Sequence, residues 1–133
     1  MKAVSARTTA GLNLGAYLIA ADNSGAKIVK IVSVKKSKAK KGKQTPAKIA
    51  DWVKVSIRRG LPDMRGKVFD AVIVRQKKFW KRPTGERVGF STNAVVLLKD
   101  EKGNPKGTQI KGPISREVAD RWPFLAKIAK FVL

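Results

Sequence analysis

Two residue types are absent from this sequence, cysteine and histidine, and each absence excludes a class of chemistry. Without cysteine there is no disulfide framework, iron–sulfur cluster, thiolate zinc site or cysteine nucleophile. Without histidine there is no serine–histidine–aspartate relay, no imidazole ligand for a metal and no histidine acid–base step. An enzyme site in this chain would have to be built from carboxylates, lysines and hydroxyls.

Long hydrophobic runs are also missing. The longest uninterrupted aliphatic stretch covers residues 94–98, whereas a membrane-spanning helix needs about 20 residues. Residues 1–13 mix basic, hydroxyl and small residues, and no apolar core follows a basic start, so they do not form a secretory signal. We therefore expect a cytoplasmic protein without membrane contact.

Acidic residues are scarce. Asp and Glu total 9, against 30 Lys and Arg, and the formal net charge is +21. Hydrophobic residues make up 43% of the chain, which is too much for a disordered polycationic tail. The length of 133 residues suits one domain with a real core. We expect a folded single domain that binds a polyanion, with no self-association.

Short apolar segments between turn residues predict a β fold. In residues 51–58, Val53, Val55 and Ile57 alternate with polar residues, as on a half-buried strand. The apolar run at residues 71–74 predicts burial on both faces of its strand. The expected strands cover residues 17–21, 26–34, 51–58, 67–75 and 94–98. Strands of this length with turns between them are typical of a small barrel or sandwich, with Trp52 and Phe69 in its core.

Toward the C-terminus the spacing of apolar residues changes from that of a strand to that of a helix. Ser115 is suited to cap a short helix through Val118, and Pro123 is suited to the first turn of a final helix. The apolar face of that final helix would be formed by Phe124, Leu125, Ile128 and Val132. We therefore expect a β-barrel with a short helical C-terminal segment, and we divide the chain into an extension (1–14), a barrel (15–110) with a hairpin (77–87), and a cap (111–133).

The densest functional signal lies in residues 75–82, where five cations and two aromatic residues precede a hairpin tip at residues 83–85. Basic side chains neutralise phosphates, and an exposed aromatic ring can stack on an unpaired base. Because Phe79 and Trp80 are adjacent, at least one of the two rings should lie outside the core. The alternative is a solvated strand edge whose lysines only prevent pairing between sheets.

Two further basic clusters accompany the hairpin. Residues 35–43 form a lysine-rich run that we expect to be an exposed loop, although such a run can also be a plain solubilising loop. In residues 58–67, arginine, lysine and glycine lie on both sides of a second loop. The residues that we predict to bind RNA are Lys35, Lys36, Lys38, Lys40, Lys41, Lys43, Arg58, Arg59, Arg65, Lys67, Arg75, Lys77, Lys78, Phe79, Trp80, Lys81, Arg82 and Arg87.

No enzyme activity, metal or cofactor is expected. The carboxylates are scattered, and nothing groups them as an acid–base pair or a metal site. A small hydrolase or nuclease would need an acidic metal pocket. The high positive charge is also compatible with an alternative function, that of a free-standing OB-like module that binds single-stranded RNA or DNA.

Several segments, in register from residue 15 to the end, resemble one known family, the large-subunit ribosomal protein uL14 family. The matching pieces are residues 21–27 (ADNSGAK), residues 71–76 (AVIVRQ), the spacing from Gly85 through Phe90 and Asn93 to residues 96–97, residues 105–108 (PKGT) and residues 112–114 (GPI). Residues 121–123 (RWP) and the N-terminal extension resemble the archaeal and eukaryotic branch of that family.

The resemblance implies a five-stranded β-barrel with a projecting β-ribbon at residues 77–87. It also implies a structural place in the large ribosomal subunit, on large-subunit rRNA at the face that meets the small subunit. Members contact small-subunit rRNA in intersubunit bridges, and they neighbour ribosomal proteins uL3 and eL24. An anti-association factor of the initiation-factor-six type would dock on the C-terminal face, for which we expect Thr108, Gln109, Lys111, Arg116 and Arg121.

Overall fold

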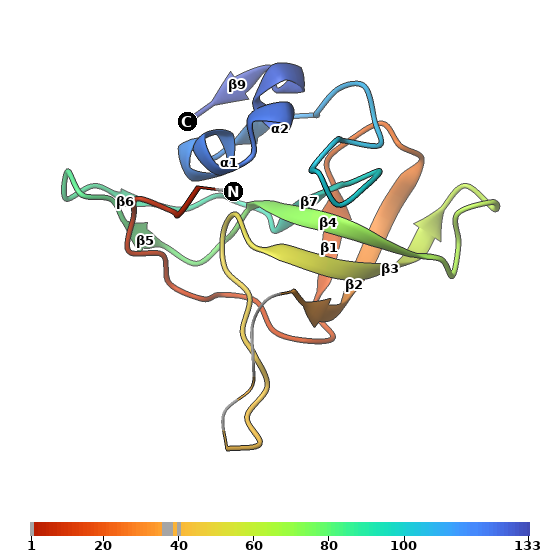
Figure 1. Ribbon diagram of the computed structural model, residues 1–133, viewed down its shortest axis with the longest axis horizontal. Coiled ribbons are helices and arrows are strands. Elements are labelled where there is room, and N and C mark those ends of the chain that lie inside the picture. Colours follow the sequence, from red (N-terminus) through yellow and green to blue (C-terminus); the bar gives the residue numbers. More distant parts are fainter. Residues whose placement is uncertain (1, 36–38, 40) are drawn as a thin grey trace.

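A computed structural model describes residues 2–35, 39 and 41–133 of the chain, and its centre is a closed β-barrel (Figure 1). The barrel strands are β1 (Tyr17–Ala20), β2 (Ala26–Val34), β3 (Trp52–Gly60), β4 (Val68–Arg75) and β7 (Ala94–Leu97). They pair in the order β1-β2-β3-β4-β7, and β1 closes the barrel by pairing with β7 in parallel. The predicted five-stranded barrel is thus confirmed.

The side chains of β3 contribute to the core of the barrel. Val53, Val55 and Ile57 are almost completely buried, whereas Lys54 and Arg58 are exposed, as the pattern predicted. Ser56, which the pattern placed on the polar face, departs from it and is buried. Residues 71–74 of β4 are all buried, because this strand has the barrel interior on one face and the C-terminal segment on the other.

The C-terminal segment packs outside the barrel as two short helices, α1 (Arg116–Arg121) and α2 (Pro123–Ile128). The Val118 amide donates to Ser115 Oγ at 3.4 Å, so the predicted cap is present. Pro123 begins α2, also as predicted. Strands β8 (Pro113–Ile114) and β9 (Phe131–Val132) pair in parallel beside these helices.

Two details of the predicted core are wrong. The final helix ends at Ile128, because the chain becomes extended at Ala129 in order to pair as β9, and Val132 therefore lies on a strand. Trp52 and Phe69 are only half-buried at the edge of the core. The indole of Trp52 meets that of Trp122 edge to face, with 6.1 Å between the ring centroids.

The β-ribbon consists of β5 (Trp80–Lys81) and β6 (Arg87–Val88), and it extends from the barrel beside the helices (Figure 1). Gly85 at its tip has a φ of 90°, which suits the tight turn there. The N-terminal segment runs along the ribbon, where Arg7 bridges to Lys81. Farther along, Leu12 is buried and bridges to Ala47.

Candidate nucleic-acid interface

The exposed cations of the predicted RNA-binding set lie on three separate projections of the barrel. In Figure 1 the β5–β6 ribbon, the β3–β4 loop and the chain after residue 40 point in three different directions. The predicted RNA-binding residues with exposed side chains are Lys41, Lys43, Arg58, Arg59, Arg65, Lys67, Lys77, Lys78, Phe79, Lys81 and Arg87. The structure therefore places the exposed residues of the predicted set on three surfaces and does not bring them together into one patch.

Trp80 is a correction to the predicted set. Only 1% of its surface is exposed, so its ring is not available for stacking on a base. Its Nε1–H donates to Glu117 Oε1 at 3.1 Å, and its ring lies 6.0 Å from that of Phe90. Of the two adjacent aromatic residues, Phe79 is the exposed one, with 56% of its surface accessible.

Arg82 is held by the same carboxylate. Its Nε donates to Glu117 Oε1 at 2.9 Å, and a terminal nitrogen donates to Oε2 at 3.2 Å. Burial alone would raise the pKa of Glu117, but the hydrogen bonds from Arg82 and Trp80 outweigh it and lower the pKa below its usual value. The guanidinium of Arg82 thus fastens the ribbon to α1 and is not a free phosphate ligand.

Lys35, the first residue of the lysine-rich run, is also engaged within the protein. Its Nζ donates to Asp70 Oδ2 at 3.1 Å and lies 4.0 Å from the centroid of a Trp52 ring. It anchors the start of the run to the barrel wall. Predicted residues Lys36, Lys38 and Lys40 lie outside the described residues.

Arg75 joins β4 to the C-terminal segment. It donates to the Lys111 carbonyl at 3.2 Å and packs across Gly112, where an added Cβ would overlap an Arg75 terminal nitrogen. Burial lowers the pKa of Arg75. Its role in the structure is to hold the chain before β8 against the barrel.

Sequence reasoning missed one cation beside the ribbon, Arg7. The main-chain amide of Arg7 donates to the Lys81 carbonyl at 3.2 Å, so the N-terminal segment forms one wall of a hollow of about 540 Å³. The opposite wall contains Phe79, Lys81 and Arg87. No local pattern could indicate this placement, because the two walls are far apart in the sequence.

Four of the five residues expected on the C-terminal face are exposed: Thr108, Gln109, Lys111 and Arg116. Thr108 is held by Asn23, whose Oδ1 accepts the Thr108 amide at 2.8 Å and whose Nδ2 donates to the Thr108 hydroxyl at 2.7 Å. Arg121 is half-buried and pairs with Asp51 at 3.8 Å.

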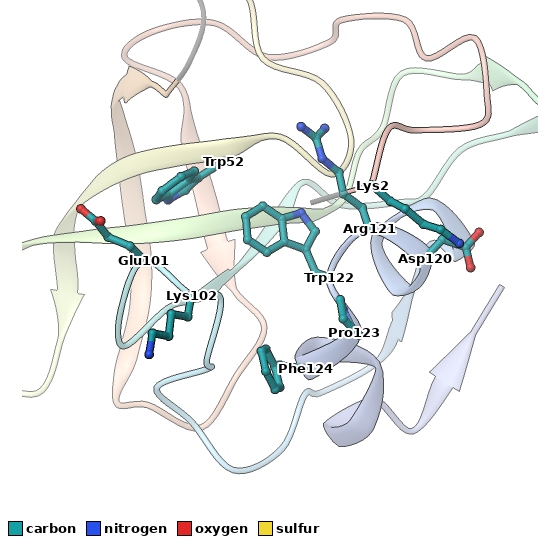
Figure 2. A pocket seen from close by; sticks show the side chains of 9 residues that line it. All are labelled: Lys2, Trp52, Glu101, Lys102, Asp120, Arg121, Trp122, Pro123 and Phe124. Carbon is teal, nitrogen blue, oxygen red and sulfur yellow. The ribbon is translucent and has the colours of Figure 1, made fainter.

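Beside Arg121 lies a hollow of about 450 Å³ (Figure 2). Figure 2 shows Trp122 between Trp52 of the barrel and Phe124 of α2, with Lys2 and Glu101 among the charged residues at the rim. Cations and carboxylates are mixed here, whereas the described residues that line the hollow beside the ribbon include no carboxylate.

In the part of the chain that the structure describes, no group of three or more acidic residues could hold a metal ion. Within the same residues, no helix is long and apolar enough to cross a membrane. Among the described residues, the exposed charged side chains are mostly basic.

Comparison with known proteins places this arrangement in a family. The model of the family described as ribosomal protein L14p/L23e matches residues 11–133. The chain belongs to that family. Over all 133 residues it is 56% identical to the large ribosomal subunit protein uL14 of Nanoarchaeum equitans, 46% identical to that of Methanothrix thermoacetophila and 44% identical to that of Halobacterium salinarum. Each of these comparisons covers the whole of both chains.

Membership of the family confirms the predicted resemblance, and these relatives belong to its archaeal branch. The chain is accordingly a structural component of the large ribosomal subunit, in a family of cytoplasmic ribosomal proteins that are not enzymes. Its basic surfaces belong to a protein of translation, for which RNA is the abundant polyanion.

Proposed function

We propose that this chain binds large-subunit rRNA through its three basic projections and contributes to bridges with small-subunit rRNA. The observation that carries the proposal is that the exposed cations of the predicted set lie on three segments, and that these segments leave the barrel in different directions (Figure 1). A single basic patch would suit one RNA segment. Three projections suit a protein surrounded by several segments of a folded RNA, in which each projection neutralises different phosphates.

The C-terminal face carries a second part of the proposal. Thr108, Gln109, Lys111 and Arg116 are exposed on it, whereas the half-buried Arg121 lies at its edge. We assign this face to protein contacts, with uL3 and eL24 as neighbours and an anti-association factor as a transient ligand. One copy of the chain would serve each particle, without self-association.

Crosslinking of intact large subunits, read by mass spectrometry of the crosslinked peptides, tests the proposed rRNA contacts. We expect RNA adducts at Lys41 and Lys43, in the β3–β4 loop and along the ribbon, and protein adducts on the C-terminal face. Buried Trp80 should carry no adduct. Adducts confined to one projection would contradict the three-sided arrangement.

The second candidate is a free-standing binder of single-stranded RNA or DNA that acts away from the ribosome, which the barrel fold and the exposed Phe79 also permit. Sedimentation of a cell extract separates the two. The proposed function predicts that the chain travels with large subunits and assembled ribosomes, whereas the second candidate predicts that it stays in the light fractions.

A further inference from the structure

The hollow between the N-terminal segment and the ribbon has walls that the fold holds at a set spacing. Besides the bridge from Arg7 to Lys81, the fully buried Gln76 donates from Nε2 to the Thr9 carbonyl at 2.7 Å. The hollow has a volume of about 540 Å³, and pockets in which proteins bind small ligands have volumes of ~300–1,000 Å³. The site therefore exists in the free protein and needs no rearrangement to accept a group of that size.

An aromatic ring on one wall is both exposed and fixed. Phe79 is 56% exposed, yet it rests against the main chain at Gly89, where an added Cβ would lie 2.7 Å from the ring carbon Cδ1. The guanidinium carbon of Arg87 lies 5.7 Å from the centroid of the ring. A ring supported in this way loses little conformational freedom when a flat group stacks on it.

The charges around the ring have one sign. Arg7, Lys81 and Arg87 are all exposed, and the described residues that line the hollow include no acid. Thr8 and Thr9 add hydroxyl groups on the N-terminal wall. An anionic group attached to a flat aromatic one would meet every feature of this lining, and a nucleotide has that composition.

From these features we propose that the hollow binds a single unpaired nucleotide of RNA, with its base on Phe79 and its phosphate between Arg7 and Lys81. The nucleotide must be unpaired because bases within a duplex are stacked on one another and offer no free face. The inference deepens the proposed rRNA binding and depends on it. It adds Arg7 and the N-terminal segment to the RNA-binding surface.

Three RNA hairpins with the same stem test the inference: one with a bulged uridine, one with an abasic bulge and one with no bulge. The full chain should bind the uridine bulge about tenfold more tightly than the other two, which is the effect of one stacked base. Phe79→Ala should abolish the preference, and Phe79→Tyr should keep it. Phe131→Ala, which removes another exposed phenyl ring on β9, is the matched control and should also keep it.

Lys81→Ala should weaken binding of the two bulged hairpins, because both keep the phosphate of the extra nucleotide and that contact does not depend on the base. If the unaltered chain binds the three hairpins equally well, the inference is wrong while the proposed function stands. If it binds none of them even at low salt, the proposed function fails as well.

A photoreactive thiouridine at the bulge gives a second measurement that uses only the unaltered chain. Its crosslink should fall in the peptides that contain residues 7–9 or 79–87. A crosslink confined to the β3–β4 loop or to the C-terminal face would overturn the inference, even if the Phe79→Ala chain proved impossible to purify.

Discussion

Arg82 and Glu117 are 35 residues apart in the sequence and are joined by two hydrogen bonds, of 2.9 and 3.2 Å. Trp80 donates to the same carboxylate. One carboxylate on α1 therefore holds β5 and the residue that follows it, and the ribbon and the C-terminal segment form one connected structure. The RNA contacts that we propose for the ribbon should consequently be coupled to the packing of the C-terminal helices.

Replacing this carboxylate should loosen that connection. Glu117→Gln keeps the size of the side chain but removes the charge that Arg82 faces, and the free energy of unfolding should fall by about 1.5–3 kcal/mol, the range for hydrogen bonds to charged groups. Urea denaturation at neutral pH measures the change. Glu101→Gln is the matched control, because Glu101 is exposed and its replacement should change stability by less than about 0.5 kcal/mol.

The same substitution makes a prediction about pH. The pKa of Glu117 is lower in the folded protein than its usual value, so its stabilisation is fully present above the pKa of an unfolded glutamate and is lost as pH falls through the folded pKa. The difference in stability between the original chain and Glu117→Gln should shrink over that acidic range. A difference that stayed constant on acidification would mean that the charge of Glu117 contributes nothing.

Lys35 should contribute to stability and not to RNA binding. Its Nζ contacts both Asp70 and the Trp52 ring, and the side chains of Lys35 and Asp70 are only 19% and 17% exposed. We expect a double-mutant cycle of Lys35→Met and Asp70→Asn to give a coupling energy of about 1 kcal/mol, within the range for residues in contact.

The control for this cycle is Lys30→Met, since Lys30 lies 5.8 Å from the ring of exposed Tyr17 and should couple to Asp70 by less than about 0.3 kcal/mol. RNA affinity measured on the same variants completes the test. If Lys35→Met weakened RNA binding as much as Lys43→Met, Lys35 would have to leave Asp70 in the complex.

The barrel could be predicted from the sequence because its signals are local. The alternation of Val53, Val55 and Ile57 is read within one strand, and the turn at residues 22–25 is read from adjacent residues. The cap at Ser115 is likewise contained in one turn of helix. The physical cause of each of these patterns lies within a few adjacent residues, so predicting them requires no knowledge of distant partners.

The residues whose roles were predicted wrongly have partners that are distant in the sequence. Trp80 looked like a stacking residue because its neighbours are basic, and its partner Glu117 lies 37 residues away. Lys35 looked like one more loop cation, and its partner Asp70 is 35 residues distant. Which cations are free and which are engaged depends on long-range packing, so the charge pattern alone overestimated the number of free cations among the described residues.

Two glycines of the β3–β4 region offer a matched pair. Gly60 has a φ of +152°, and an added Cβ would lie 2.6 Å from the Gly25 carbonyl oxygen, whereas a Cβ on Gly66, at a φ of +79°, would meet no atom within 4 Å. Gly66→Ala should lower the free energy of unfolding by about 1–2 kcal/mol, which is the cost of the left-handed backbone conformation alone. Gly60→Ala should cost more than that, because the main chains of β2 and β3 must also separate.

Denaturant midpoints and m-values for the two glycine variants provide the measurement. Equal losses of stability would show that the close approach of Gly60 to Gly25 is absent in solution.

The exposed cations of the ribbon should act as individual phosphate ligands. When a protein binds RNA, each neutralised phosphate adds about 0.7–0.9 to the slope of log affinity against log salt concentration, because counterions are released. Lys81→Ala should therefore lower the slope by about that amount, measured with a structured fragment of large-subunit rRNA. Lys130→Ala removes the same charge from an exposed site between α2 and β9, outside the ribbon, and it should leave the slope unchanged. If the two variants shifted the slope equally, the net charge of +21 would act as a diffuse field, and the ribbon would hold no particular phosphate.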